Sequence, residues 1–256
     1  MLIAGKIAVV TGAAKGIGAA LVRELKDRGA VHVAALDLSE GVRSLGADSS
    51  YICDVSDREA IRDTIEQIEV HAGPIDLFCS NAGILGALNF DTAAGADALE
   101  WQRAWDVNVM AHVHAAAVLV PLMRARGGGY FLQTASAAGL LSQIGSAAYS
   151  TTKHAAIGFA ENLAIAHRDD GIRVSVLCPQ GVDTDMIKGA ADHPAVLDGV
   201  LSAEAVAKAA LDGVEAERFL ILPHPKVDDY LRAKVMDYDR WIGGMAKLQR
   251  GYQSTN

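Results

Sequence analysis

The sequence predicts a single α/β domain with a doubly wound, mostly parallel sheet of seven strands and helices on both of its faces. Three observations support this prediction. Short apolar runs alternate with longer helical patterns, the first run ends in a glycine-rich turn, and most later runs end at a polar residue or a proline. The chain has 256 residues, of which 51% are hydrophobic, so it can bury a substantial core; only six residues are prolines and no segment resembles a linker.

The elements are expected in the following order. Apolar runs typical of buried strands lie at 7–10, 31–36, 51–53, 75–79, 130–134, 172–177 and 219–222. Helical patterns lie between them at 17–28, 57–71, 100–125, 149–168 and 203–216. Ser56-Asp57-Arg58-Glu59 resembles a capping box at the start of the second helix. Helical connections of this length join parallel strands, so we expect a doubly wound sheet of the Rossmann type.

Composition argues against several classes of function. The net charge of −8 disfavours nucleic acid as a partner, because a basic face supplies most of that affinity, and it also disfavours an anionic membrane surface. No run approaches the roughly 18 apolar residues of a membrane span, and the N-terminus lacks the pattern of a signal peptide. Cys53, Cys79 and Cys178 lie in or beside apolar runs with no CxxC pair, which predicts buried thiols, a reducing compartment and no metal site. We therefore expect a cytoplasmic protein.

Residues with a special role gather where the predicted strands end. Ligands of doubly wound sheets bind outside the carboxyl ends of the strands. The residues at these ends are Gly12, Asp37, Asp54, Asn81, Ser136 and Pro179. The sequence therefore predicts one site along this edge.

The glycine-rich turn Thr11-Gly12-Ala13-Ala14-Lys15-Gly16-Ile17-Gly18 is a candidate dinucleotide site. Its glycines let backbone N–H groups approach a pyrophosphate, and the next helix offers its positive end. Asp37 lies 19 residues after Gly18 and could bind the adenosine ribose hydroxyls while repelling a 2′-phosphate. Leu38 offers such a phosphate no positive charge, which favours NAD; Lys15 could reach it, which leaves NADP open.

Tyr149 and Lys153 are candidates for proton transfer. They lie four residues apart on a predicted helix and so share a face. A lysine ammonium about 4.5 Å away would lower the tyrosine pKa by about 2–3 units, before an opposing effect of burial. Ser136, at the end of the preceding strand, could hydrogen-bond the same substrate oxygen. The three residues together predict a general acid–base site.

From about residue 5 to residue 222, these motifs resemble the classical short-chain dehydrogenase/reductase family. The glycine turn is similar to its cofactor loop, Asp54-Val55 to its adenine-contacting pair, and Asn81-Ala82-Gly83 to its cofactor-supporting turn. Pro179-Gln180-Gly181-Val182-Asp183-Thr184 resembles the segment that holds the nicotinamide carboxamide. The cofactor residues implied are Gly12, Lys15, Gly16, Ile17, Gly18, Asp37, Leu38, Asp54, Val55, Asn81, Ala82, Gly83, Tyr149, Lys153, Pro179, Val182 and Thr184.

The resemblance also implies a catalytic set of four residues: Asn108, Ser136, Tyr149 and Lys153. Tyr149 would be the acid/base, and Ser136 would fix and polarise the substrate oxygen. Lys153 would lower the tyrosine pKa and bind the nicotinamide ribose, and Asn108 would hold a water that connects it to solvent. The chain departs from the family at Gln180, where glycine is common; its amide either selects substrates or points to solvent.

The residues around the predicted substrate pocket are mostly apolar, which favours a hydrophobic secondary alcohol or its ketone. Residues 184–200 are expected to form a mobile lid. The predicted substrate-binding residues are Ser136, Ala138, Gln143, Ile144, Tyr149, Gln180 and Met186.

Residues 224–256 lie outside the family pattern and are expected to form a helical extension. The residues that recur there at helical spacing, and that predict one amphipathic helix, are Val227, Tyr230, Leu231, Val235, Tyr238, Trp241 and Ile242. The apolar stripe of this helix would contact the core, another subunit or the substrate pocket.

The predicted function is an NAD-dependent oxidoreductase that transfers a hydride between a hydrophobic secondary alcohol or ketone and nicotinamide. Two alternatives remain: an NADP(H)-dependent carbonyl reductase, and a non-catalytic dinucleotide-binding sensor or scaffold. The family resemblance implies a homodimer or homotetramer through the helices around 101–125 and 149–168.

Overall fold

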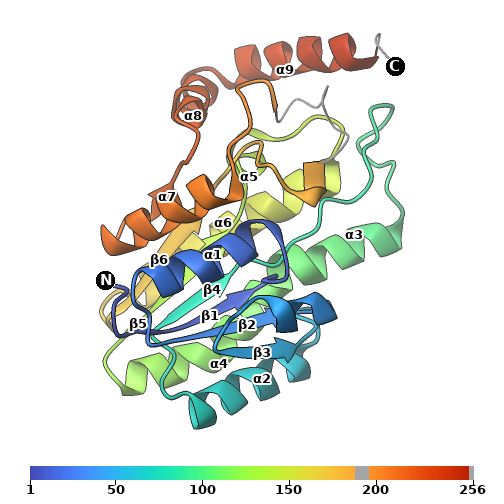
Figure 1. Ribbon diagram of the computed structural model, residues 1–256. Helices are drawn as coiled ribbons and strands as arrows, with labels where there is room; N and C mark the ends of the chain where they lie inside the picture. The colour runs from blue at the N-terminus through green and yellow to red at the C-terminus, as the bar shows by residue number, and fades with distance from the viewer. Residues whose placement is uncertain (188–195, 254–256) are drawn as a thin grey trace.

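The computed structural model describes residues 1–187 and 196–253 and shows an α/β protein built on one seven-stranded sheet (Figure 1). The strands run parallel in the order β3-β2-β1-β4-β5-β6-β7. The chain starts near the middle of the sheet, winds to one edge and then to the other, which confirms the predicted doubly wound topology. The strands are β1 (Ile7–Thr11), β2 (His32–Asp37), β3 (Ser49–Ile52), β4 (Leu77–Ser80), β5 (Gly129–Thr134), β6 (Ile172–Leu177) and β7 (Leu220–Ile221).

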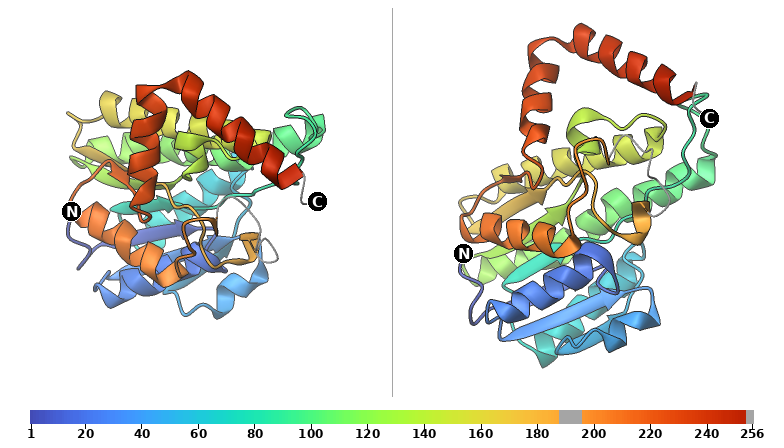
Figure 2. Two further views of the ribbon diagram at one scale, coloured as in Figure 1. Left: turned by 90° about the horizontal axis from the view of Figure 1, so that it is seen from above. Right: turned by 45° about the horizontal axis from the view of Figure 1, so that its top comes forward.

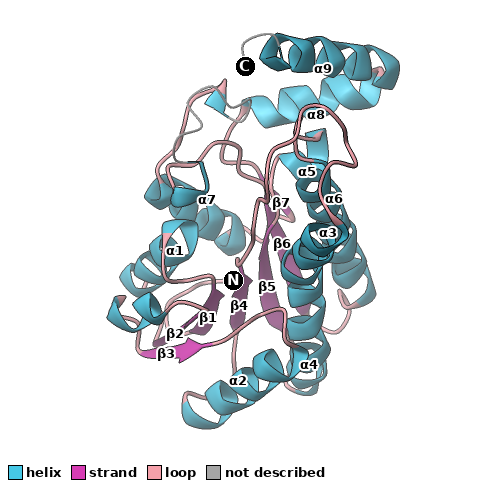
Figure 3. Cartoon of the chain, turned by 90° about the vertical axis from the view of Figure 1, so that its right-hand side faces the viewer, coloured by secondary structure: helices cyan, strands magenta, loops and turns pink. Residues whose placement is uncertain are grey.

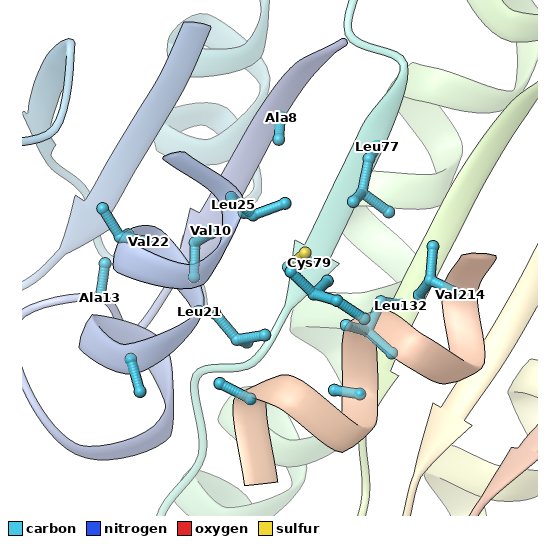
Figure 4. Packing of buried hydrophobic residues seen from close by; sticks show 14 of the residues in the cluster. Ala8, Val10, Ala13, Leu21, Val22, Leu25, Leu77, Cys79, Leu132 and Val214 are labelled. Carbon is cyan, nitrogen blue, oxygen red and sulfur yellow. The ribbon is translucent and has the colours of Figure 1, made fainter. Parts of the chain in front are cut away.

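Helices cover both faces of the sheet, because parallel strands of this kind are apolar on both sides (Figure 3). On one face, Leu21 and Leu25 from α1 and Val214 from α7 pack over Val10 and Leu77 of the sheet (Figure 4). The other face lies under α2, α4 and α6. These helices are α1 (Gly16–Asp27), α2 (Arg58–His71), α4 (Ala111–Ala125), α6 (Ala147–Ala166) and α7 (Ala203–Glu215).

The helix expected over 100–125 is interrupted. It consists of α3 (Ala98–Trp105), a π-helical turn η2 (Asp106–Met110) and α4. In such turns each backbone hydrogen bond spans one residue more than in an α-helix, and they often occur at functional sites. Here the turn carries Asn108, whose side chain is fully buried.

Helix α2 begins at a different residue from the one that the capping-box pattern predicts. The N-cap is Asp57, whose carboxylate accepts hydrogen bonds from the backbone N–H groups of Glu59 and Ala60. The prediction that Ser56 caps this helix is therefore wrong by one position. The reason is that Ser56 bonds to the Asp54 carboxylate instead, through both its N–H and its hydroxyl.

Some boundaries also differ. The strand expected at 51–53 begins earlier and ends at Ile52, and the strand expected at 219–222 shortens to two residues. Three short helical elements were not predicted: η1 (Glu40–Ser44), α5 (Ala138–Leu141) and η3 (Asp185–Ile187).

The C-terminal extension forms two helices, not one. Helix α8 (Lys226–Met236) ends where Asp237 adopts an extended backbone, and α9 (Tyr238–Gln253) then runs in a new direction above the sheet edge (Figure 2). In α8, Val227 is fully buried in a small apolar cluster with Ala137 and Leu141. Helix α9 contributes no fully buried residue, so it lies on the body of the protein without joining its core.

One helical stretch of the described chain, Ala98–Ala125, is long and apolar enough to span a membrane by length and composition, with a mean hydropathy of 1.4. It is formed by α3, η2 and α4, and 44% of its most apolar window is buried inside the protein. Core helices commonly pass this test, and α4 packs here against the sheet.

Candidate active site

A cleft of about 540 Å³ opens at the carboxyl edge of the sheet and collects residues from distant parts of the chain. The predicted cofactor residues that line it are Gly12, Lys15, Gly16, Ile17, Asp37, Leu38, Asp54, Val55, Asn81, Ala82, Gly83, Tyr149, Lys153, Pro179, Val182 and Thr184. Gly18 does not line the cleft. It lies behind the turn, where a Cβ would collide with the carbonyl oxygen of Gly12.

The glycine turn is compact because two of its residues have backbones that other residues rarely adopt. Gly12 has φ +63 and Gly16 has φ +55. A Cβ on Gly12 would also lie 2.8 Å from Cα of Ala82, in the turn after β4. Helix α1 begins at Gly16, so its positive end faces the cleft and can hold an anion such as a pyrophosphate.

Asp37 and Lys15 carry the charges that bear on cofactor choice. The Asp37 carboxylate accepts hydrogen bonds from the N–H groups of Ala14, at 2.9 Å, and Ser39, at 2.8 Å. These bonds hold it at the end of β2, on the wall of the cleft. Lys15 forms an ion pair with Asp185 at 3.3 Å, and both residues line the cleft. Its positive charge therefore already has an acidic partner.

Hydrogen bonds join the ends of the three central strands. The Thr11 hydroxyl at the end of β1 accepts from the N–H groups of Asn81, at 2.9 Å, and Ala82, at 3.0 Å. The Asn81 amide donates to the Thr11 carbonyl, and its Oδ1 accepts from the Thr134 hydroxyl at the end of β5. Asn81 thus supports the floor of the cleft, between the glycine turn and the reaction site.

Asn108 is held firmly beneath this floor. Its Oδ1 accepts from the Ile84 N–H at 2.9 Å, and its Nδ2 donates to the Ile84 carbonyl at 2.9 Å and to the Thr152 hydroxyl at 3.1 Å. Gly83 allows close approach, since a Cβ there would lie 3.2 Å from both Asn108 Oδ1 and Lys153 Nζ. Both amide hydrogens of Asn108 are therefore engaged, and its side chain is adjacent to Lys153.

Tyr149, Ser136 and Lys153 come together at the inner end of the cleft, all buried. Lys153 Nζ lies 5.6 Å from the centre of the Tyr149 ring and donates to the Thr134 carbonyl at 3.0 Å. Burial raises the pKa of Tyr149; the Ser136 hydroxyl opposes this effect and Cys178 adds to it. Burial also lowers the pKa of Lys153 to about 8.

In this arrangement of the protein alone, burial, which was expected to oppose the effect of Lys153, dominates, and the pKa of Tyr149 is raised. The ammonium points to a backbone carbonyl, and burial removes the water that would stabilise either charge. A further positive charge in the cleft would favour the phenolate and lower the tyrosine pKa.

A second cavity of about 280 Å³ adjoins the first. The two cavities share Ser136, Tyr149, Gln180 and Met186. All seven predicted substrate residues line this second cavity, and most of the remaining lining side chains are apolar. A molecule held there would meet the Tyr149 and Ser136 hydroxyls where the cavities join.

Comparison with known families identifies this architecture. The family model described as short chain dehydrogenase matches residues 6–195. The chain belongs to this family. It is 35% identical over 225 residues to 1-deoxy-11-beta-hydroxypentalenate dehydrogenase of Streptomyces avermitilis, covering 84% of this chain and 83% of that protein.

Two further matches differ in coverage. The chain is 36% identical over 201 residues to the sex determination protein tasselseed-2 of Zea mays, covering 72% of this chain but only 57% of the relative's length. A crystal structure of a short-chain dehydrogenase/reductase from Burkholderia phymatum in complex with NAD is similar, with a TM-score of 0.83 and 28% identity, covering 93% of this chain and 96% of that one.

In this short-chain dehydrogenase, the C-terminal helices form part of the second cavity. Tyr230 of α8 and Trp241, Met245 and Leu248 of α9 line it. The Tyr230 and Trp241 rings are 6.4 Å apart, and both contact the apolar cluster around Val227. Of the contacts expected for the tail, the structure shows the one with the predicted substrate pocket of its own chain.

The sequence reasoning missed several residues of the site. In the first cavity these include α3 residues Leu99, Gln102 and Arg103, and in the second Leu85, Leu197 and Asp198 as well as the residues of α8 and α9. The sequence shows the helical spacing of Tyr230 and Trp241. It does not show the bend at Asp237, which turns Trp241 toward the cavity. The predicted lid over 184–200 lies partly outside the described residues; Met186, Leu197 and Asp198 line the second cavity.

Proposed function

We propose that this protein is an NAD-dependent dehydrogenase that oxidises a hydrophobic secondary alcohol to its ketone, and that the reaction is reversible. The observation that carries this proposal is the junction of the two cavities at Tyr149 and Ser136. One cavity has the glycine turn, the helix N-terminus and the ribose-side carboxylate of a dinucleotide site. The other is mainly apolar and suited to an uncharged organic molecule.

The residues of the first cavity fit NAD. The glycine turn and the N-terminus of α1 line this cavity, where backbone N–H groups can hold a pyrophosphate. Asp37 lies where a carboxylate can accept from ribose hydroxyls, and Leu38 beside it carries no charge for a 2′-phosphate. The ion pair of Lys15 with Asp185 argues against Lys15 as a phosphate ligand. The NAD complex of the Burkholderia phymatum relative supports the same cofactor.

The roles of the reacting residues follow from their positions. A bound oxidised nicotinamide would supply the hydride acceptor and a positive charge, and the residues of the first cavity would hold it. The Tyr149 hydroxyl, as phenolate, accepts the proton of the substrate hydroxyl, while the Ser136 hydroxyl donates a hydrogen bond to the same oxygen. Lys153, with a pKa of about 8, can exchange a proton near neutral pH, and Asn108 fixes the segment next to it.

A substitution at Tyr149 tests this proposal. We expect the wild-type protein to form NADH from hydrophobic secondary alcohols, with weaker use of NADP. Tyr149→Phe should lower kcat/KM by about 10²–10⁴-fold, because it removes the acid/base and leaves the cavity shape intact. NAD affinity, measured by calorimetry, should change little. Turnover that survives in Tyr149→Phe would contradict the mechanism.

Tyr130→Phe is the matched control. Tyr130 is also buried, but its hydroxyl bonds to Ser175 at 2.8 Å inside the sheet, away from both cavities. This variant should lose some stability and keep its activity. Preferential turnover with NADPH would favour the carbonyl reductase alternative, and NAD binding without turnover of any alcohol or ketone would favour a sensor. Cytoplasmic location and a homodimer or homotetramer remain part of the proposal.

A further inference from the structure

Gln180 is the residue at which the chain departs from the common family pattern, and its side chain lies between the two cavities. It follows Pro179 after β6 and lines both of them. Its backbone N–H donates to His224 Nδ1 at 3.1 Å, so His224 Nε2 carries the hydrogen and donates to the Gly181 carbonyl at 3.0 Å. The backbone at this position is therefore fixed, and the remaining freedom is that of the Gln180 side chain.

Asp198 determines which way the Gln180 amide points. Gln180 Nε2 donates to Asp198 Oδ2 at 3.1 Å, and Asp198 Oδ1 accepts from Lys226 at 2.9 Å and Tyr230 at 3.1 Å. Burial alone would raise the pKa of Asp198, but these hydrogen bonds lower it. Only 8% of the Asp198 side chain is exposed. An ionised carboxylate accepts hydrogen bonds but cannot donate them, so the amide nitrogen must face Asp198.

The amide oxygen of Gln180 is consequently left without a partner. Oε1 is buried, and no donor among the described residues lies within hydrogen-bond distance. A buried acceptor without a donor is unfavourable, and native proteins leave few of them. The donor that this oxygen lacks can come from a molecule in the adjoining cavities.

The position of the other polar groups favours the substrate over the cofactor as that molecule. Asp198 and Tyr230, which hold the Gln180 amide in place, line the second cavity and not the cofactor cleft. The chain of hydrogen bonds from Tyr230 through Asp198 to Gln180 is thus a polar strip along an otherwise mainly apolar wall. A ligand with one extra hydroxyl group would donate the hydrogen bond that Gln180 Oε1 lacks.

We propose that Gln180, oriented by Asp198, accepts a hydrogen bond from a second hydroxyl group of the substrate. The substrate class is then an apolar diol or hydroxy ketone, not an alcohol with a single polar group. The second hydroxyl lies on the side of the reacting carbon that faces Gln180. This inference rests on the proposed function, because it assigns the second cavity to the substrate.

Matched probes can test for a donor. Cyclohexane-1,2-diol, -1,3-diol and -1,4-diol each have a monomethyl ether that keeps one hydroxyl free but replaces the other donor with an acceptor. Binding to the NAD-loaded protein is followed by intrinsic tryptophan fluorescence, to which Trp241 on the cavity wall contributes, and NADH formation is measured separately. We expect at least one diol to bind about tenfold more tightly than its ether, the usual size of one satisfied buried hydrogen bond.

Variants connect that preference to Gln180. Gln180→Leu, which keeps the approximate size but removes the acceptor, should bring diol and ether affinities to within about twofold. Asp198→Asn allows the Gln180 amide to turn either way and should also weaken the preference. Lys226→Met is the control, because it removes an exposed partner of Asp198 without changing the Gln180–Asp198 bond. It should retain the preference.

The outcomes separate the two proposals. Equal binding of every diol and its ether by the wild-type protein would overturn the role of Gln180. So would a Gln180→Leu variant that keeps the preference but binds NAD more weakly, since the amide would then serve the cofactor. A clear diol preference in binding without NADH formation would instead contradict the proposed dehydrogenase activity and leave the role of Gln180 supported.

Discussion

The cofactor cleft and the roof of the second cavity are built in different ways. The cleft is made from strand ends whose backbones are joined by Thr11 and Asn81 and whose glycine turn approaches Ala82 closely. The roof is α9, which contributes no fully buried residue. The first site is therefore inseparable from the core of the fold, whereas the second is closed by a segment that can vary without disturbing the sheet.

The contacts of the roof show how lightly it is held. At its far end, Gln249 and Gln253 both donate to the Phe90 carbonyl, at 3.2 and 2.6 Å, and the Phe90 and Tyr252 rings stack 6.3 Å apart. At its near end the contact is between Trp241 and Tyr230. Helix α9 therefore lines the second cavity between these two groups of contacts, and Figure 2 shows from above how the helix runs.

The largest effect is expected from adding one methyl group behind the glycine turn of the cleft. A Cβ on Gly18 would collide with the Gly12 carbonyl and contact the Asn81 amide. Gly18→Ala should lower the free energy of unfolding by about 3 kcal/mol and abolish NAD binding, since the turn must shift to accommodate it. Urea unfolding and calorimetric titration with NAD measure the two effects.

The same substitution in the roof provides the comparison. Gly244 lies in α9 with no atom within 4 Å of its would-be Cβ. Gly244→Ala should leave NAD affinity unchanged and stabilise the helix by up to about 1 kcal/mol. A Gly18→Ala protein as stable as Gly244→Ala would show that the cleft is not built into the core.

A smaller effect is expected from removing the roof. A chain that ends at Asp237 keeps α8 and its buried Val227 but loses Trp241, Met245 and Leu248 from the cavity wall. Because apolar contacts of this size contribute about 1.5–3 kcal/mol, kcat/KM for a hydrophobic alcohol should fall about 10–100-fold. NAD affinity and thermal stability should stay close to those of the full chain.

Point variants distinguish lost contacts from general damage to the tail. Trp241 faces the cavity, whereas the neighbouring Ile242 is 59% exposed. Trp241→Ala should reproduce much of the loss of kcat/KM, and Ile242→Ala should not. If the two variants behave alike, α9 acts through some contact other than the cavity wall.

This difference also explains what the sequence alone could predict. The strands, the glycine turn and the strand-end residues from Gly12 to Pro179 follow from local patterns and fixed spacing, and the cavity collects nearly all of them. The contribution of Asp198 and the direction of α9 depend on docking between distant segments, which local periodicity does not encode. The extent to which burial raises the pKa of Tyr149 could not be predicted for a similar reason, because burial depends on the whole fold.

The buried His112 should make the sheet side of the molecule sensitive to acid. Its Nδ1 lies 2.7 Å from the Ser80 hydroxyl, and burial, with a smaller contribution from the charge of Lys153, lowers its pKa to about 3. The unfolded chain binds a proton at about pH 6.5, so the stability that neutral His112 provides is complete above that pH and is lost as pH falls toward 3.

When the pH falls from about 7.5 to about 5, His112 alone should lower the free energy of unfolding by about 2 kcal/mol. The reason is that pH 5 lies roughly 1.5 units below the pKa of this histidine in the unfolded chain. His112→Gln should remove most of that slope in urea unfolding. Removing α9 should not change it. An identical slope in the wild-type and His112→Gln proteins would assign the acid sensitivity to other groups.

The smallest effect concerns an exposed ion pair on the wall of the cofactor cleft. Lys15 in the glycine turn and Asp185 at the start of η3 are 73% and 46% exposed, and exposed pairs contribute little. Lys15→Met should therefore change the free energy of unfolding by less than about 0.5 kcal/mol and NAD affinity by less than about threefold. Affinity for NADP, measured in the same titrations, decides what Lys15 does. If it falls much more than affinity for NAD, Lys15 leaves Asp185 to bind a 2′-phosphate, and the carbonyl reductase alternative gains its first support.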